Sequence, residues 1–98
     1  MTMHVAVFRW CDGVDIEKQT AVLSEALDRM VEQIPGLLSF ERGGDLGLYP
    51  RSFDFVLVAR FVDEDALRAY KENSLHEQVF RSCIEPMLEA QGSVQFEV

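Results

Sequence analysis

The segment from Phe53 to Val62 constrains the fold more than any other part of the sequence. Apolar side chains fill both sets of alternating positions in it, and only Asp54 and Arg60 interrupt them. A β-strand points successive side chains to opposite faces, so a strand that is apolar on both faces needs cover on both. If helices cover one face of its sheet, a second copy of the chain would cover the other. The segment therefore predicts a homodimer built through its sheet faces.

Strand and helix signals alternate in the N-terminal half of the chain. Residues 3–10 are dense in β-formers and predict a strand. Asp15 is suited to cap the next helix, which Pro35-Gly36 should end. That helix has an apolar stripe at three- and four-residue steps, made of Leu23, Ala26, Leu27, Met30, Val31 and Ile34. Residues 37–42 predict a second strand, and the glycine-rich residues 43–50 predict a loop.

Two helical segments follow the apolar segment. Asp63 can cap a short helix that runs to about Asn73. Ser74 and Glu77 match a capping box, which predicts that a new helix begins at Ser74. Pro86 lacks an amide donor, so this helix should kink or end nearby.

The last residues complete a β-α-β-β-α-β order. Gln91-Gly92 predicts a turn, and residues 93–98 alternate as a half-buried strand whose assignment of faces stays ambiguous. This order predicts a single α+β domain over residues 1–98, with a ferredoxin-like four-stranded antiparallel sheet and its helices on one face. Two such sheets, packed uncovered face to uncovered face, would form a dimeric α/β barrel.

Charge and apolar content exclude several classes of partner. The formal net charge of −8 argues against binding to nucleic acid and to anionic membranes. No signal peptide is evident, and no apolar run approaches the roughly 18 residues of a membrane span. Cys11 and Cys83 are too few for a disulfide scaffold and are expected to be reduced thiols. We therefore expect a cytoplasmic protein.

Tyr70 and His76 are the candidate catalytic residues, because few other side chains here could move a proton near neutral pH. If Ser74 caps the helix, the helix dipole should lower the pKa of His76 and favour the neutral imidazole that a general base requires. Tyr70 could donate to a developing oxyanion. Both rings could instead serve packing alone, and the Asn73-Ser74 pair leaves their relative direction open.

Further candidates would bind a ligand rather than react with it. His4 lies on one face of the first strand, where it is either a pocket residue or a satisfied core histidine. Apolar residues that could line a cavity or simply fill the core include Phe8, Trp10, Leu27, Leu57 and Ala59. Neither histidine has a further His or Cys at ligand spacing, so we expect no metal and no other cofactor.

Segments spread over roughly 90 residues resemble the stress-responsive A/B barrel family, also called the dimeric α/β-barrel or Dabb family. They are His4 with Phe8-Arg9-Trp10, Ile34-Pro35-Gly36-Leu37, Gly44-Asp45-Leu46, Ser52-Phe53-Asp54, Phe61 to Leu67, Tyr70 with His76, Glu85 to Leu88 and Val94-Gln95-Phe96. The resemblance implies the same ferredoxin-like fold and homodimers formed through the open sheet faces.

The resemblance also bears on function. The family includes plant stress-induced proteins and a cyclase that makes olivetolic acid by aldol condensation, using Tyr-x-x-His-Pro-x-His and a further His in its pocket. Tyr70, His76 and His4 match the Tyr, the second His and the pocket His. Asn73-Ser74 stands where the family often has His-Pro. Gln95 stands at a pocket position where many members have Asp, so a carboxylate partner for His76 is missing.

Two functions from different classes are consistent with these residues. The first is a homodimeric protein that binds a small apolar or aromatic ligand without turnover. The alternative is a cofactor-independent, cyclase-type enzyme in which His76 abstracts a proton next to a carbonyl and Tyr70 stabilises the oxyanion. A haem-free monooxygenase acting on quinol-like aromatics shares the fold class, but it rests on fold analogy alone.

Overall fold

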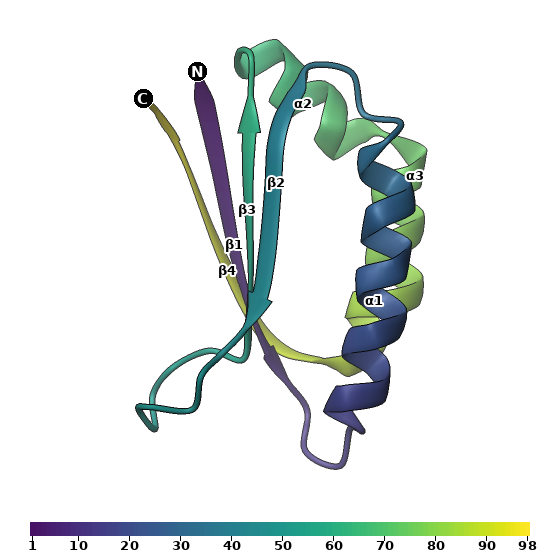
Figure 1. Ribbon diagram of the computed structural model, residues 1–98, viewed down its shortest axis with the longest axis vertical. Helices are drawn as coiled ribbons and strands as arrows, with labels where there is room; N and C mark the ends of the chain where they lie inside the picture. The colour runs from purple at the N-terminus through teal and green to yellow at the C-terminus, as the bar shows by residue number, and fades with distance from the viewer.

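The computed structural model describes residues 1–98 as one sheet with its helices stacked against one face (Figure 1). The strands are β1 (Thr2–Trp10), β2 (Leu37–Gly44), β3 (Phe55–Phe61) and β4 (Leu88–Glu97), and the α-helices are α1 (Ile16–Val31), α2 (Glu64–Glu72) and α3 (Ser74–Val79). A π-helical turn, η1 (Phe80–Ile84), and a 3₁₀ turn, η2 (Glu85–Met87), connect α3 to β4. The sheet order is β2-β3-β1-β4, and each neighbouring pair is antiparallel. The predicted ferredoxin-like α+β fold is confirmed.

The apolar segment forms β3, which lies inside the sheet between β2 and β1. One set of its alternating side chains packs under the helices and is at most 4% exposed: Phe55, Leu57, Ala59 and Phe61. Val56 and Val58 lie on the other face, which no helix covers, and they are half-buried. The prediction of an interior strand that is apolar on both faces is therefore confirmed.

The uncovered face is apolar beyond β3. Val58 pairs with Val5 of β1, and Val5 pairs with Val94 of β4, so the three valines form one row across the sheet. Val94 is 55% exposed, and its neighbour on this face, Phe96, is 48% exposed. The register also settles the faces of the last strand, because Gln95 pairs with His4 and so lies on the helix-covered face.

The predicted helix signals are largely confirmed. The Asp15 carboxylate accepts a hydrogen bond from the Lys18 amide at 3.2 Å, and the Asp63 carboxylate accepts one from the Ala66 amide at 2.8 Å. The apolar stripe of α1 is buried against the sheet through Leu23, Leu27 and Met30. Such caps stabilise a helix by about 1 kcal/mol each.

Several boundaries differ from the sequence prediction. Asn73, not Ser74, caps α3, because its side-chain oxygen accepts from the Leu75 amide at 2.8 Å while its own extended backbone ends α2. Gln91-Gly92 forms no turn: both residues continue β4 and pair with Phe8 and Val7, since β1 is long enough to extend the ladder. β2 likewise continues through the predicted loop as far as Gly44, and β3 begins at Phe55 rather than Phe53.

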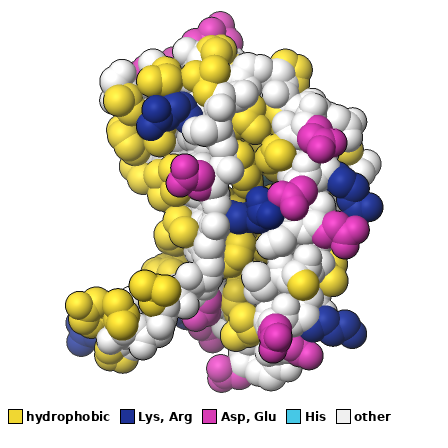
Figure 2. Space-filling view, viewed as in Figure 1, with side chains coloured by type: hydrophobic (Ala, Val, Ile, Leu, Met, Phe, Trp, Pro, Cys, Tyr) yellow, Lys and Arg dark blue, Asp and Glu magenta, His cyan; other side chains and the backbone are white.

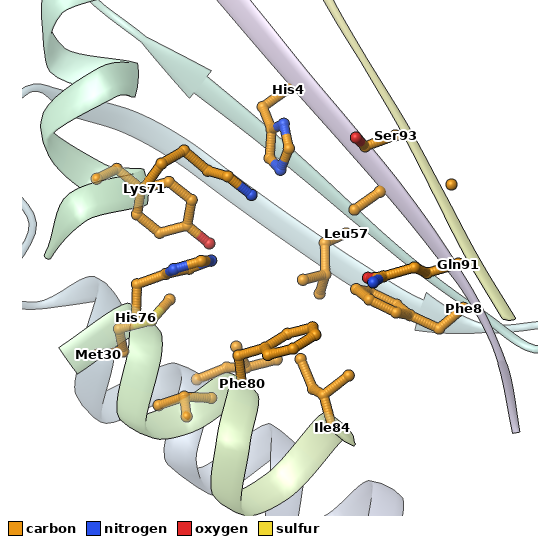
Figure 3. Close-up of a pocket in the computed structure, with 15 residues that line it drawn as sticks. His4, Phe8, Met30, Leu57, Lys71, His76, Phe80, Ile84, Gln91 and Ser93 are labelled. Carbon is orange, nitrogen blue, oxygen red and sulfur yellow. The ribbon is translucent and has the colours of Figure 1, made fainter. Parts of the chain in front are cut away.

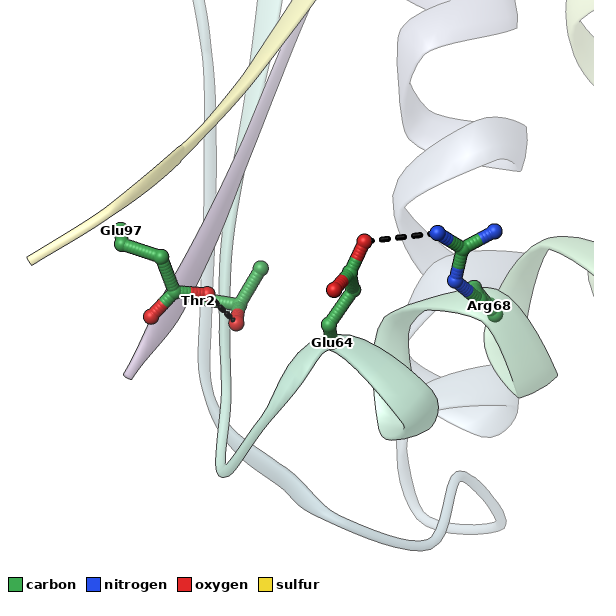
Figure 4. Close-up of polar contacts among 4 residues, drawn as sticks. All are labelled: Thr2, Glu64, Arg68 and Glu97. Atoms are coloured by element: carbon green, nitrogen blue, oxygen red, sulfur yellow. Dashed lines mark hydrogen bonds and ion pairs between the residues drawn. The ribbon is translucent and has the colours of Figure 1, made fainter.

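The two chain termini contact each other at one end of the β1–β4 strand pair. The Thr2 hydroxyl donates to the Glu97 carboxylate, so the first and last strands are joined side by side (Figure 4). The amino group of Met1 lies 3.6 Å from the same carboxylate. Cys11 and Cys83 are both free thiols. None of the helices has the length and apolar character that crossing a membrane requires.

Candidate functional site

A partly enclosed cavity of about 410 Å³ lies between the helix-covered face of the sheet and the helices (Figure 3). Its apolar wall comes from β1, β3, α1 and η1, with Phe8, Leu57, Met30, Phe80 and Ile84 among its residues. Polar side chains line it from α2, α3, β1 and β4. A volume of this size is typical of sites for small organic ligands.

The cavity brings together most of the predicted site residues. His4, Phe8, Leu27, Leu57, Tyr70 and His76 line it. Trp10, Ala59 and Gln95 do not. Trp10 is buried beneath Phe8, with the two rings stacked at 5.7 Å between centroids. Ala59 has no exposed surface, because its short side chain is covered completely in the core.

Tyr70 lies between the two imidazoles. Its ring centroid is 4.5 Å from that of His76 and 6.2 Å from that of His4, with edge-to-face geometry in both pairs. The backbone break at Asn73 explains the first contact, because it ends α2 and lets α3 start in a new direction. The relative direction of Tyr70 and His76, which the sequence left open, is therefore convergent.

Both imidazoles are neutral at pH 7. Burial is the main cause that lowers the pKa of His76 from 6.5 to about 4, and the nearby charge of Lys71 lowers it further against the opposing effect of Glu77. Burial also lowers the pKa of His4 to about 4, with help from the Lys71 charge. The predicted direction for His76 is confirmed, but desolvation rather than a helix dipole is the main cause.

Gln95 orients His4, not His76. Its amide nitrogen lies 2.9 Å from His4 Nδ1. The amide donates and the ring nitrogen accepts, so the proton of the neutral imidazole resides on Nε2. Gln95, predicted to contact a ligand, instead contacts a side chain that does line the cavity. Gln95 is exposed and lies outside the cavity, in a neighbouring hollow that His4 also lines.

Tyr70 is a hydrogen-bond donor at all ordinary pH values. Burial raises its pKa well above 10, and the residue is 2% exposed. A protonated phenol beside two neutral imidazoles can donate to a carbonyl or enolate oxygen, while an imidazole nitrogen accepts a proton. The arrangement is thus chemically equipped for acid–base work at a carbonyl group.

Sequence reasoning missed Lys71, which also lines the cavity. Its position one residue after Tyr70 was the only available signal, and a lysine next to a buried aromatic residue usually points to solvent. Burial lowers the pKa of its ammonium group from the ordinary 10.5. Figure 3 shows its side chain extending from α2 toward His4.

The model of the stress responsive A/B barrel domain family matches residues 3–98. The chain belongs to this family. No curated protein sequence matches the chain.

Solved structures of similar proteins agree with this assignment to the A/B barrel family. A dimeric ferredoxin-like protein of unknown function from Thermobifida fusca YX is 36% identical, with a TM-score of 0.89, over 99% of this chain and 90% of that one. A dimeric protein of unknown function from Bacteroides fragilis NCTC 9343 is 20% identical, with a TM-score of 0.81, over 99% and 95% of the two chains. Hydroxynitrile lyase from Passiflora edulis is 13% identical, with a TM-score of 0.84, over 99% and 92%. At 20% and 13% identity, the last two show the fold alone.

Proposed function

We propose that this A/B barrel protein binds a small apolar or aromatic compound in the cavity beneath α2 and α3. The observation that carries the proposal is the distribution of polarity in the cavity. His4, Tyr70 and His76 gather at one end, while the remaining wall is mainly aliphatic and aromatic. A few convergent polar groups in an apolar hollow fix the orientation of a ligand, and the apolar wall supplies the affinity.

The second candidate function is proton abstraction next to a carbonyl, and the Tyr70–His76 pair favours it. The substrate C–H bond would break, its proton would pass to a ring nitrogen of His76, and its electron pair would move onto the carbonyl oxygen. The Tyr70 hydroxyl would donate a hydrogen bond to that oxygen as its negative charge develops. No cofactor takes part in this step.

The low pKa of His76 limits which substrates this step would suit. An imidazole with a pKa of about 4 is present as free base at pH 7, but it is a weak base. Proton transfer to it from carbon is uphill, and it is least unfavourable from an activated carbon, such as one flanked by two carbonyl groups. β-Dicarbonyl compounds therefore fit better than simple ketones. The hydroxynitrile lyase of similar fold shows that this architecture can hold an enzyme site.

One experiment separates the two candidate functions. Ethyl 3-oxo-3-phenylpropanoate would be incubated with the protein in deuterated buffer, and exchange at its central carbon would be followed by NMR. Exchange faster than in buffer alone, lost in His76→Gln and weakened in Tyr70→Phe, would establish proton abstraction. Binding without faster exchange would leave a ligand-binding protein. If neither this compound nor a panel of aryl ketones and aryl carboxylates changes the melting temperature, the ligand-binding proposal fails.

We also propose that the chain forms a homodimer through the uncovered sheet face. The aliphatic row of Val58, Val5 and Val94 is continuous with Phe96 on that face, and no element of the same chain covers it. Exposed apolar patches of this extent usually mark interfaces. Two solved structures of similar proteins are described as dimeric.

The β2–β3 connection supports the same dimer. It projects from the sheet on the side away from the helices (Figure 1), and apolar side chains gather at its tip (Figure 2). Leu46, Leu48 and Tyr49 there are 85%, 68% and 72% exposed. A second copy on the uncovered face would lie within reach of this arm, so the arm adds apolar area to the proposed interface.

A cytoplasmic location, which we propose as well, is consistent with the two free thiols.

A further inference from the structure

Charge is distributed unevenly between the cavity and the rest of the molecule. The chain carries 17 acidic and 9 basic side chains, for a net charge of −8. No aspartate or glutamate lines the cavity, and Lys71 is its one charged residue, since both histidines are neutral at pH 7. The cavity wall is therefore positive in a strongly negative protein.

Lys71 has no ion-pair partner in the chain. Glu64 lies two turns earlier on α2, and its carboxylate is 2.7 Å from an Arg68 nitrogen (Figure 4). Glu64, Arg68 and Glu72 line a second, more open hollow between α2 and the β1–β4 edge of the sheet, which shares Lys71 and His4 with the cavity. The Lys71 side chain extends toward His4, where the two hollows meet (Figure 3). Its charge is felt by both imidazoles, which is why it contributes to lowering the pKa of each.

We propose that Lys71 makes the cavity selective for apolar or aromatic carboxylates, with the ligand carboxylate at Lys71 and its apolar body against Phe80 and Ile84. This inference rests on the proposed ligand-binding function and names the class of ligand. Lys71 supplies the counter-charge that the cavity otherwise lacks. It acts as a specificity-determining residue, because it touches the ligand without taking or giving a proton.

Neutral donors beside Lys71 complete a site for an anionic oxygen. The Gln95 contact holds His4 in the tautomer with its proton on Nε2, and Tyr70 stays protonated. A carboxylate has two oxygens and accepts several hydrogen bonds, so it can use these donors together with the ammonium. A neutral amide of the same shape would keep the apolar contacts and lose the ionic one. The difference between the two affinities therefore isolates the contribution of Lys71.

The test compares matched probes by isothermal titration calorimetry. The probes are phenylacetate, 4-phenylbutanoate and naphthalene-1-acetate, each paired with its primary amide. The wild-type protein is expected to bind at least one carboxylate about tenfold or more tightly than its amide, equivalent to about 1.4 kcal/mol. Lys71→Met should remove this preference, so that the acid and its amide bind with about equal affinity, whereas Lys71→Arg should restore it. Lys18→Met, at an exposed lysine of α1, is the matched control for net charge and should behave as wild type.

The outcomes distinguish this inference from the proposed function. Equal affinity for acids and amides in the wild-type protein would overturn the role of Lys71 while leaving ligand binding intact. A preference that survives in Lys71→Met, or that falls equally in Lys18→Met, would show a general effect of charge and would also overturn it. If no probe of either series binds, ligand binding in the cavity and the role of Lys71 both fail.

Discussion

Acidification should destabilise this protein through its two cavity histidines, and the sign follows from their pKa values. In the unfolded chain both imidazoles have an ordinary pKa of 6.5, but in the folded protein the pKa of each is about 4. Between these values the unfolded state binds more protons than the folded state. The free energy of unfolding therefore falls as the pH falls below 6.5, and the loss is complete near pH 4.

The expected magnitude can be worked out at pH 5. This pH lies about 1.5 units below the ordinary pKa, and each unit corresponds to 1.36 kcal/mol, so each histidine loses about 2 kcal/mol of stabilisation. Together the two residues should lose roughly 3–4 kcal/mol, a large part of the 5–15 kcal/mol that is typical of a domain. Titration of the acidic side chains toward the sequence pI of about 4.6 relieves repulsion and acts in the opposite direction.

Urea unfolding at pH 7.5, 6.0 and 5.0 provides the assay, at one fixed protein concentration because a dimer would couple stability to concentration. The control is the double variant His4→Gln/His76→Gln, which keeps the acidic residues and removes both imidazoles. Its loss of stability on acidification should be smaller than that of the wild type by about 3 kcal/mol. If the two proteins show the same pH dependence, the imidazoles are not held neutral by the fold, and the reasoning about the cavity is refuted.

Three further predictions concern the fold and the assembly. Val58→Asp should convert the proposed dimer to a monomer in analytical ultracentrifugation, because it puts charges into the row of valines; an unchanged dimer would place the interface elsewhere. Gly36→Ala should lower the free energy of unfolding by more than Gly13→Ala: both glycines have positive φ, but only at Gly36 would an added Cβ lie 2.7 Å from the Ala66 Cβ. Equal losses would contradict this. Asn73→Ala should cost about 1 kcal/mol through loss of the α3 cap and raise the pKa of His76 measured by NMR; an unchanged pKa would mean that the cap does not position the ring.

Local patterns were sufficient to predict the fold. The alternation in residues 3–10 and the two-sided apolar character of β3 each identified a strand, since side-chain period is a direct consequence of strand geometry. Glycine was the main source of error. Gly43, Gly44 and Gly92 all indicated turns or loops, yet each lies in a strand, because long-range pairing with β3 or β1 outweighs the weak local preference.

The site was harder to predict than the fold. The fold follows from backbone positions, whereas the site depends on where the functional groups at the ends of long side chains lie. Tyr70 and His76 were identified by their chemistry, and their convergence follows from the Asn73 break that the sequence indicated only approximately. Trp10 shares a face with Phe8, which predicts that it lines the cavity, but its ring is buried against Phe8 and Phe55 and does not line it. No local pattern could show that the exposed Lys71 also lines the cavity.

The desolvation that keeps the imidazoles neutral also lowers the pKa of Lys71. An unpaired ammonium that lines a cavity reduces the stability of the folded protein by its own desolvation, and the lowered pKa of Lys71 records that effect. A ligand carboxylate would reverse it, restoring the pKa of Lys71 and, by placing a negative charge near both rings, raising the pKa of His4 and His76. Binding of an anion would then make His76 a stronger base than it is in the empty cavity. Ligand recognition by Lys71 and proton abstraction by His76 would thus be coupled through charge, so a carboxylate substrate would activate the base that acts on it.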